Sequence, residues 1–395
     1  MLYKISSDSN TLHVLRCIWL MPNISRIDIA RVIGVNQSTV SRIVASLIDD
    51  KIVEVVSFGE SGPLGGRKPV HLRLNPRFGC VIGMEMQSEK FTIVGLNPLG
   101  EVLFKLKETY ADPEKPLSSL FVDALKKAQA QVALTGLNLL GIGVGIPGLV
   151  DNREGVILRS NPLEIYTPVR IVEELSRLVE VPVRIEHDAR CCCRAELAFS
   201  RGRCPPNFMF VLGEFRRSQL MHLGYDAIAL GMGFVFDNRV YTGEQFAAGE
   251  FKSIFHSQGD GNPVFGIPDS ELAKLHTDPE VRGRFCRELA RNIALLVNVL
   301  NLTKVVIGGN VQELGGGLLD AIREEIRANW LYPDQNSFEV EYTKLGEEAV
   351  AYGAAGMFLE HFLSPPYAGP SALEIISRSE NGRSARRTSP ASAEK

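Results

Sequence analysis

The sequence predicts an α/β protein in which a winged helix-turn-helix precedes a larger two-part α/β domain. Three observations support this fold class. The first 76 residues show three short helical patterns followed by two strands, and residues 77–363 alternate between strands and helices. At 395 residues, with 45% hydrophobic and 23% charged residues, the chain is also too long for one ordinary core. Residues 364–395, rich in Pro, Ser, Arg and Gly, are expected to be a disordered tail.

Turn and capping residues divide the start of the chain into three helices. Pro22 ends the first helix, because proline cannot continue a helical hydrogen-bond ladder. Ser25 has the side chain of an N-cap for the second helix, and Gly34 ends that helix. Asn36 is expected to cap the third helix.

The third helix has one apolar side and one polar side. Its apolar stripe repeats at helical spacing and consists of Val40, Ile43, Val44 and Leu47. The opposite side carries short polar groups and one arginine, so it could enter the major groove of DNA. Arg42 can reach guanine or phosphate, and Gln37 can pair with adenine. The residues expected to face DNA are Gln37, Ser38, Thr39, Ser41 and Arg42.

A basic, glycine-rich connection joins the two strands expected at residues 52–56 and 70–74. It ends in Arg67 and Lys68, two cations for the DNA backbone or a minor groove. Residues 25–80 contain eight Lys and Arg and five acidic residues. Their net charge is therefore positive, as a phosphate-binding surface requires. The plainer alternative is a three-helix structural unit with a solvated loop. The order of helices, strands and basic tip favours a DNA-binding wing.

From residue 77 the pattern is typical of two similar α/β halves, each opening with a strand, a turn and a strand. The expected strands are 81–86, 91–96, 101–105, 141–148, 183–186, 227–236, 239–241 and 304–307. The expected helices are 168–179, 189–199, 287–300 and 318–329.

Three clusters in this region could carry chemistry. Glu186, His187 and Asp188 lie where a strand ends and a helix begins, a position at which α/β sheets bind ligands. The alternative is that Asp188 only caps the helix. The glycine-rich segment 243–250 delivers Glu250, which could accept hydrogen bonds from a sugar hydroxyl or be a surface residue of a tight loop. The glycine pair in 305–309 could hold a nucleotide or be a simple turn.

Several segments, taken in their order along the chain, resemble the ROK family of repressors, open reading frames and sugar kinases. The similar segments are 141–148, 160–163, 181–189, 241–250, 306–309 and 345–355. The resemblance implies a two-lobed, actin-like ATPase (ribonuclease-H-like) sugar-kinase fold with a cleft between the lobes. Together with the winged helix, it implies membership of the repressor branch.

The chain departs from the kinase pattern of that family at both phosphate loops. Where the kinases have Asp-Ile-Gly-Gly-Thr, residues 85–89 begin with Glu85, contain no glycine and end with Glu89. The second loop, Gly-Thr-Gly in the kinases, is Ala-Ile-Ala at residues 227–229. Added negative charge and side chains oppose phosphate binding, so no catalytic residue and no nucleotide cofactor are expected. The zinc motif is absent too, since residues 256–270 contain no cysteine, and no metal is expected.

The sugar-binding side of the resemblance is better preserved. It implies that Asp188, Glu250 and Asn161 contact a sugar. His187 stands where the family usually has asparagine, and Ser253 where it usually has a sugar-binding histidine. The implied ligand site is therefore Asn161, His187, Asp188 and Glu250, with the identity of the sugar left open.

The resulting prediction is a transcriptional regulator, a repressor of carbohydrate genes, that binds a double-stranded DNA operator and a small sugar effector. It is expected to be a homodimer or homotetramer reading a palindrome. No apolar run suits a membrane span or a signal peptide, and the seven cysteines include three in a row, so a reducing cytoplasm is expected. The alternatives are a ROK-type ATP-dependent sugar kinase with a fused DNA-binding domain, and a regulator with a vestigial cleft that answers to a partner protein.

Overall fold

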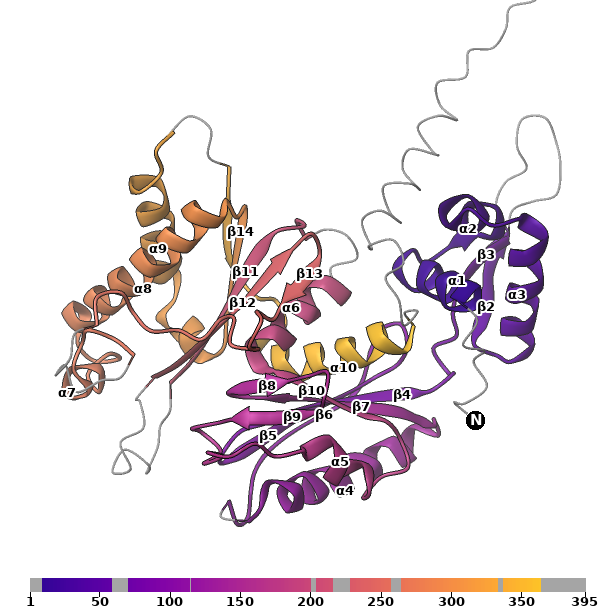
Figure 1. Ribbon diagram of the computed structural model, residues 1–395, viewed down its shortest axis with the longest axis horizontal. Helices are drawn as coiled ribbons and strands as arrows, with labels where there is room; N and C mark the ends of the chain where they lie inside the picture. The colour runs from indigo at the N-terminus through magenta and orange to yellow at the C-terminus, as the bar shows by residue number, and fades with distance from the viewer. Residues whose placement is uncertain are drawn as a thin grey trace, which may run out of the picture.

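The computed structural model describes residues 9–58, 70–113, 115–199, 204–215, 228–256, 264–332 and 337–363. A small N-terminal domain is followed by two larger lobes, each built on a five-stranded sheet (Figure 1). The small domain lies beside the first lobe, on the opposite side of the molecule from the long helices of the second lobe.

The N-terminal domain is a winged helix-turn-helix, as predicted. Its helices are α1 (Ser9–Leu20), α2 (Arg26–Ile33) and α3 (Gln37–Asp49), and its strands β1 (Ile24–Ser25), β2 (Val53–Phe58) and β3 (Val70–Leu74) pair in the order β1-β3-β2. The Ser25 hydroxyl accepts a hydrogen bond from the backbone N–H of Asp28 at 3.2 Å, which confirms the N-cap. Gly34 ends α2 in the left-handed conformation at φ 71°. Asn36 occupies the cap position of α3 but makes no side-chain capping bond.

The first lobe contains a mixed sheet in the order β10-β7-β4-β5-β6. Its elements are β4 (Cys80–Met86), β5 (Lys90–Leu96), β6 (Val102–Thr109), α4 (Leu117–Thr135), β7 (Leu139–Ile146), α5 (Ile171–Ser176) and β10 (Val183–His187), with the hairpin β8 (Leu149–Asp151) and β9 (Val156–Arg159). Strands β4, β7 and β10 are parallel, so their carboxyl ends meet at one edge. Glu85 and Glu186 both pair in register with Gly145, which places them on either side of β7.

The second lobe repeats this topology with the order β13-β12-β11-β14-β15. Its elements are β11 (Phe208–Phe215), β12 (Ile228–Phe236), β13 (Arg239–Tyr241), α7 (Asp269–Leu272), α8 (Pro279–Leu300), β14 (Lys304–Gly308), η3 (Asn310–Leu314), α9 (Gly316–Ala328), β15 (Glu339–Tyr342) and η5 (Gly346–Glu348). In both sheets the first three strands in chain order pair antiparallel. Two later strands then extend the sheet in parallel from the free side of the first strand. The expectation of two similar halves is confirmed.

Two helices cross between the lobes. Helix α6 (Asp188–Phe199) follows the first sheet but shares a core with β11, β12 and β14 of the second. Helix α10 (Ala349–Phe362) follows the second sheet but packs on β4, β5 and β7 of the first (Figure 1). The two helices touch backbone to backbone: a Cβ added at Gly353 would lie 1.7 Å from the carbonyl oxygen of Cys191. Any movement of one lobe against the other must therefore move this helix pair.

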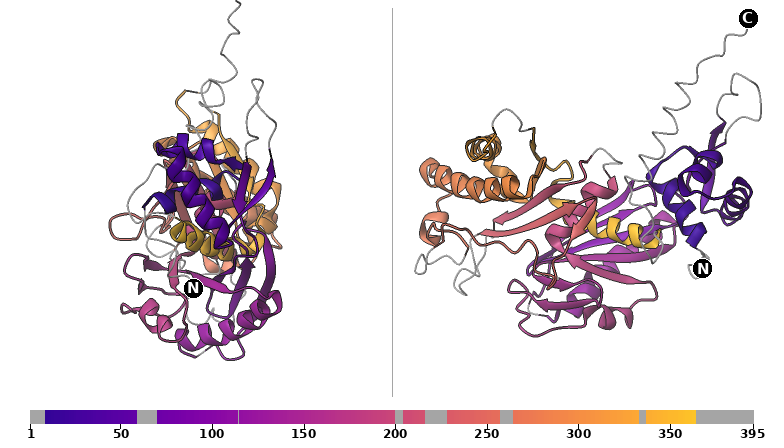
Figure 2. Two further views of the ribbon diagram at one scale, coloured as in Figure 1. Left: turned by 90° about the vertical axis from the view of Figure 1, so that its right-hand side faces the viewer. Right: turned by 45° about the horizontal axis from the view of Figure 1, so that its top comes forward.

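The end of α10 is part of the core of the N-terminal domain. Leu363 is 2% exposed and packs in one cluster with Leu15, Ile18 and Leu72, and Phe362 packs against the same cluster. Trp19 contacts both this core and the cluster formed by α10 with the first sheet. Both views of Figure 2 show the small domain at the end of α10. The winged helix is thus attached by packing to a helix that itself joins the two lobes.

The predicted elements agree with the structure except in a few places. Strands β3 and β13 have the predicted bounds, and the other predicted strands and helices are present with shifted ends. Helix α8 begins at Pro279 rather than at residue 287, because the Asp278 side chain caps it two turns earlier. The strand expected to start at Ala227 is described from Ile228 onward. Helices α4, α7 and α10, strands β1, β8, β9, β11 and β15, and the short 3-10 helices η3 and η5 are not predicted by the sequence patterns.

All seven cysteines lie within the described residues, are buried and form no disulfide. Among the described helices, none has both the length and the apolar character of a bilayer-spanning segment.

Candidate functional site

The exposed side of α3 presents the residues expected to contact DNA. Gln37, Ser38 and Arg42 are exposed, and Thr39 and Ser41 are half-buried. The apolar stripe of α3, formed by Val40, Ile43, Val44 and Leu47, is buried in the domain core. No described residue pairs with the Arg42 guanidinium, so this cation is available to a base edge or a phosphate.

The predicted wing begins from an antiparallel hairpin next to this helix. Strands β2 and β3 pair along their length, and Arg73 donates to Glu54 across them at 2.6 Å. Arg67 and Lys68, the two cations predicted for the wing tip, lie outside the described residues. Only the base of the wing is therefore placed by the structure.

Three of the four predicted ligand residues come together at the carboxyl edge of the first sheet. His187 ends β10 and Asp188 begins α6. The His187 Nε2 atom lies 3.1 Å from Asp188 Oδ1 and 3.8 Å from Glu250 Oε1. His187 is 4% exposed, and its Nδ1 atom is buried without a hydrogen-bond partner. The imidazole thus joins two carboxylates from different lobes.

Helix capping does not account for the position of the Asp188 side chain. A capping oxygen accepts from backbone N–H groups two or three residues further on. The Asp188 Oδ1 atom instead accepts from the adjacent N–H of Ala189 at 2.6 Å and faces His187. The side chain is therefore directed toward the imidazole and the cleft.

The loop that carries Glu250 is fixed against β12. The Met232 N–H donates to the Gly249 carbonyl at 2.9 Å, and Glu250 forms a bridge with Gly231. A Cβ at Gly249, whose φ is 98°, would lie 1.7 Å from the Met232 carbonyl oxygen. Glycine is required here, in agreement with the close backbone approach that the sequence predicts. Glu250 itself remains half-exposed, since 52% of its side chain is accessible.

Asn161 is not part of this cluster. It is exposed after β9, and its Oδ1 atom accepts from Arg159 Nε at 3.3 Å. Ser253 is buried, and its hydroxyl accepts from Asn292 Nδ2 at 3.1 Å and from the Phe255 N–H at 3.2 Å. The Ser253 hydroxyl is thus engaged within the second lobe.

Two further carboxyl groups, those of Glu85 and Glu214, lie near the ends of the first strands of the two sheets. Glu85, near the end of β4, is 4% exposed, and Gln87 donates to it at 2.6 Å. Burial, followed by the charge of Glu214 and then that of Asp188, raises the pKa of Glu85 to about 8. The pKa of Glu214, near the end of β11, is also raised, chiefly by burial. Lys90 opposes both shifts but leaves the site rich in acidic groups.

Glu214 was missed from the sequence, although the repeated topology contained a signal. It lies near the end of the first strand of the second sheet, as Glu85 does in the first. The sequence suggested Glu89 as an added negative charge at the first phosphate loop. In the structure it is exposed in the turn after β4, and it is not among the groups named as shifting the pKa of Glu85. Gly309, with φ 82°, is required where the chain passes Gly213, because an added Cβ would lie 2.2 Å from its carbonyl oxygen.

This arrangement favours hydroxyl donors and opposes polyphosphates. Asp188 and Glu250 are acceptors suited to sugar hydroxyls, and His187 can donate or accept. The raised pKa of Glu85 keeps this carboxyl protonated near neutral pH, so it supplies no positive charge to a phosphate. Its ionised form would repel a phosphate by about 1 kcal/mol at about 4 Å in water and by more in a cleft. Among the described residues, no group of three His, Cys, Asp or Glu side chains is arranged to hold a metal ion.

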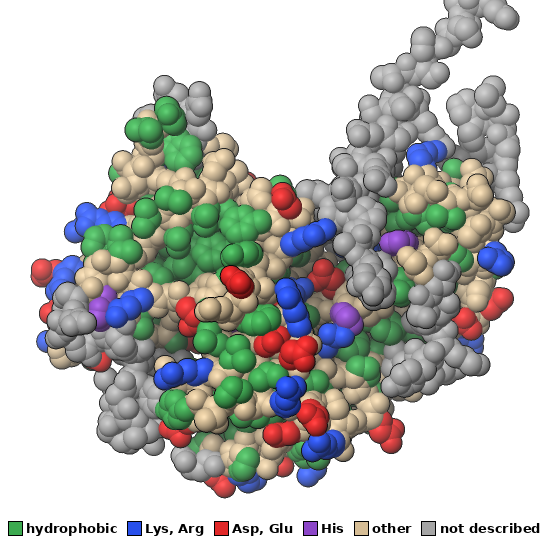
Figure 3. Space-filling model, viewed as in Figure 1, with side chains coloured by type: hydrophobic (Ala, Val, Ile, Leu, Met, Phe, Trp, Pro, Cys, Tyr) green, Lys and Arg blue, Asp and Glu red, His purple; other side chains and the backbone are tan. Residues whose placement is uncertain are grey.

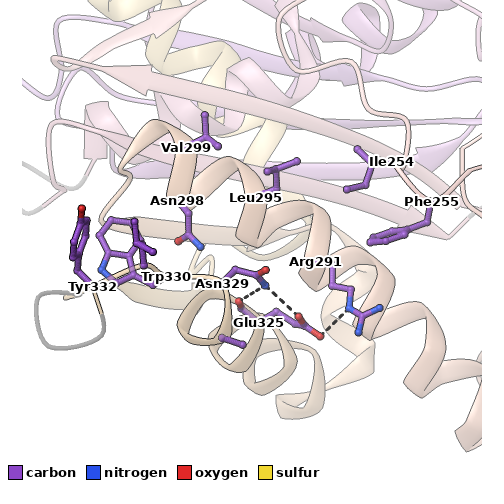
Figure 4. Close-up of a pocket in the computed structure, with 12 residues that line it drawn as sticks. Ile254, Phe255, Arg291, Leu295, Asn298, Val299, Glu325, Asn329, Trp330 and Tyr332 are labelled. Atoms are coloured by element: carbon purple, nitrogen blue, oxygen red, sulfur yellow. Dashed lines mark hydrogen bonds and ion pairs between the residues drawn. The ribbon is translucent and has the colours of Figure 1, made fainter.

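A separate apolar surface covers the outside of the second lobe. Helices α8 and α9 and the segments next to them form a pocket of 720 Å³ (Figures 3 and 4). Its large exposed side chains include Val299, 72% accessible, and Leu331, 78% accessible. The Arg291–Glu325 ion pair, at 3.1 Å, lies between Asn329 and Phe255 (Figure 4). We call this surface the lobe-2 face; its apolar members are Ile254, Phe255, Leu295, Val299, Ala328, Trp330, Leu331 and Tyr332.

Comparison with known proteins matches both parts of the chain. The ROK family model matches residues 81–255 and 272–361, and the MarR family model matches residues 9–56. A xylose repressor from Caldicellulosiruptor bescii is 28% identical, over 91% of this chain and 98% of the repressor.

Solved structures show the same fold. The crystal structure of a ROK family transcriptional regulator, a homologue of the Escherichia coli Mlc protein, has a TM-score of 0.71 at 20% identity, over 95% of this chain and 99% of that chain. A ROK family glucokinase from Streptomyces griseus, solved with glucose and AMPPNP, has a TM-score of 0.52 at 22% identity, over 71% of this chain and 99% of the kinase. The predicted combination of a winged helix with a two-lobed, actin-like domain is confirmed.

The buried Glu85 carboxyl leads to a prediction about stability. Its pKa of about 8 lies above the ordinary value of 4.5, so the folded protein keeps a proton that the unfolded chain has lost between these values. Glu85 therefore makes folding less favourable as the pH rises through this window. Glu85→Gln removes that effect. The difference in free energy of unfolding, variant minus parent, should therefore increase by about 1–4 kcal/mol between pH ~5 and pH ~8. Urea unfolding at several pH values measures it.

The matched control is Glu89→Gln, which removes an exposed carboxyl from the adjacent turn. This variant should keep the pH profile of the parent. Parallel profiles for the parent and Glu85→Gln would contradict the assignment of a protonated Glu85.

Proposed function

Because the chain belongs to the ROK family, we propose that it is a transcriptional repressor of carbohydrate genes whose lobes bind a sugar without phosphorylating it. One observation carries the proposal: a winged helix packs on the end of α10, while acidic side chains fill the kinase-like cleft beneath. A relative named xylose repressor has both parts, since the match spans 98% of its length. The name supports a sugar-responsive role for this chain.

On the DNA side, we assign operator binding to the first domain, residues 1–76. Gln37, Ser38, Thr39, Ser41 and Arg42 on α3 would read a major groove, with Arg67 and Lys68 of the wing on the flanking backbone or minor groove. The chain would work in the cytoplasm, where its operator lies.

On the ligand side, we assign effector binding to the lobes, residues 77–363. Asp188, Glu250 and His187 would contact sugar hydroxyls, and closure of the lobes would bring Asn161 to the same ligand. The proposed site uses no nucleotide and no metal, and none of its residues acts as a catalyst.

Substitutions on α3 and in the wing separate specific from general DNA contacts. Arg42→Ala should cost about 1–3 kcal/mol of operator binding and relax sequence preference, because it removes a base contact. Arg67→Ala should weaken all sequences alike and reduce the salt slope by about one. Fluorescence anisotropy with operator and scrambled duplexes over a salt series measures both effects.

Arg177→Ala is the control, because Arg177 is a 71% accessible side chain on the first lobe. It should bind like the parent. Identical behaviour of Arg42→Ala and Arg67→Ala would contradict the assignment of the helix and the wing.

Replacement of Asp188 tests the effector site. Asp188→Asn should weaken sugar binding by about 10- to 100-fold, since a charged hydrogen bond becomes a neutral one. The measurement is isothermal titration of the full chain with D-xylose, D-glucose and N-acetyl-D-glucosamine. Asp320→Asn, on the surface of α9, is the control and should bind like the parent.

Two outcomes would overturn this part of the proposal. Absence of heat with every sugar would favour a cleft that answers to a partner protein. Sugar-dependent ATP consumption that Asp188→Asn abolishes would favour a kinase with a fused DNA-binding domain.

We further propose that the chain acts as a homodimer joined through the lobe-2 face. Reading a palindromic operator needs two copies, and a two-fold interface must be complementary to itself. The lobe-2 face combines large exposed apolar side chains with the Arg291–Glu325 pair, and apolar side chains together with polar groups are typical of dimer interfaces. A homotetramer would add a second interface to this one.

A charge at the centre of the lobe-2 face should separate the copies. Val299→Glu is expected to weaken self-association by about 30-fold or more, because a carboxylate would be buried in the interface. Sedimentation velocity over a concentration series measures it. Leu134→Glu, at an 81% exposed position on α4, is the control. A dimer that survives Val299→Glu unchanged would contradict the assignment.

A further inference from the structure

A buried carboxylate next to the ligand cluster holds five hydrogen bonds. Glu186 is fully buried, and its Oε1 atom accepts from Arg190 Nε at 2.7 Å and from the His187 N–H at 3.0 Å. Its Oε2 atom accepts from Asn152 at 2.7 Å and from two nitrogens of Arg194 at 3.1 and 3.2 Å. Burial alone would raise the pKa of Glu186, but Arg194 and Arg190 outweigh it and hold the pKa below the ordinary value. The residue is therefore an anion paired with two cations.

The first of these arginines holds the loop that bears Glu250. Arg190 is fully buried and donates to the Phe246 carbonyl at 3.0 Å and to the Val150 carbonyl at 2.9 Å. Phe246 has a φ of 59°, an unfavourable conformation for a residue with a side chain. Because Arg190 binds the carbonyl of that residue, the position of the Glu250 loop is tied to Glu186.

The second arginine reaches α10. Arg194 donates to Glu360 Oε2 at 2.8 Å while it also holds Glu186. Its planar guanidinium bridges the two carboxylates, which a lysine ammonium on a single stem would not do in this geometry. Nearby, Arg184 contacts His361 of the same helix end, and burial followed by the charge of Arg184 lowers the pKa of His361 to about 4.

Glu360 lies immediately before the residues that enter the winged-helix core. Phe362 and Leu363, two and three positions further on, pack with the core of the N-terminal domain. A continuous series of hydrogen bonds therefore runs from the Glu250 loop through Arg190, Glu186 and Arg194 to the helix end beneath the winged helix. We call it the Glu186 relay.

We propose that the Glu186 relay transmits effector occupancy to the DNA-binding domain. The inference rests on the proposed function and names the residues that regulate it. A sugar held by Glu250 and Asp188 displaces the Glu250 loop and the start of α6, the two points that Arg190 and Glu186 connect. Arg194 passes the change to Glu360, and the winged helix shifts with the end of α10. The relay residues position other groups and do not touch the sugar.

The experiment measures coupling, the ratio of operator Kd with and without sugar, in the full-length chain. Each of D-xylose, D-glucose and N-acetyl-D-glucosamine serves as a probe at saturation. Glu360→Gln removes the charge that Arg194 needs at the partly exposed end of the relay. Operator affinity without sugar should stay within about twofold of the parent, and so should sugar affinity without DNA. The coupling ratio should fall by about 2- to 30-fold.

A control and a second variant isolate the relay. Glu108→Gln removes a carboxylate of similar exposure from the Lys127–Glu108 pair, which joins β6 to α4, and should keep the coupling of the parent. Arg194→Lys keeps the charge but loses the bridge, and should reduce coupling as Glu360→Gln does. By linkage, the effect of DNA on sugar affinity should fall by the same factor in each variant.

The outcomes separate the inference from the function on which it rests. If the parent responds to a sugar and both Glu360→Gln and Arg194→Lys, folded by circular dichroism, keep its full coupling ratio, the relay is wrong and the proposed function stands. If no probe changes operator binding by the parent, the sugar-responsive function fails and the relay fails with it. A fall in coupling that Glu108→Gln reproduces would also overturn the relay.

Discussion

The packing of α6 against α10 is the constraint on which the rest of the architecture depends. Each helix follows one sheet in the chain and packs on the other, so one face of each sheet is covered by the helix that follows the other sheet. The contact between Gly353 and Cys191 brings the two backbones together and leaves no room for adjustment by side chains. A change in the angle between the lobes must appear as a movement of both helices. Asp188 of the ligand cluster begins α6, and the winged helix packs on the end of α10. Both candidate sites are therefore connected to the pair of helices α6 and α10.

Buried carboxyl groups determine which ligands the cleft can hold. The architecture is shared with a ROK family glucokinase, but fold does not determine chemistry. Here burial and the charge of Glu214 raise the pKa of Glu85, and burial raises the pKa of Glu214, at the edge where the first strands of the two sheets end. A kinase must concentrate positive charge and backbone N–H groups around phosphates, and this cleft concentrates carboxylates. In the proposed function, weak phosphate binding would leave the acceptors for hydroxyl groups in place, so that the protein would bind a sugar without phosphorylating it.

The sequence is most informative where interactions are local. Ser25 and Gly34 act within one helical turn, so the winged helix could be predicted almost completely, and the adjacency of His187 and Asp188 placed them together in advance. Helix α10 was missed because it is buried on nearly every side and shows no polar face from which a helical period can be detected. The approach of Glu214 to Glu85 depends on two sheets meeting, which no local pattern encodes. The resemblance groups Asn161 with the other predicted ligand residues, and in the structure its side chain accepts a hydrogen bond from Arg159.

A regulator of this design needs two states that differ by little free energy. A ligand shifts an equilibrium only by its differential affinity for the two states, so a sugar that contacts one lobe alone would have no effect on the winged helix. Glu250 comes from the second lobe and His187 from the first, and they approach within 3.8 Å. A ligand that contacts both groups would make all of its contacts only when the lobes adopt one relative position. In the proposed function the same step would move α10, and with it the domain that would hold DNA. Contacts to both lobes would therefore let a small molecule act at a distance on the winged helix.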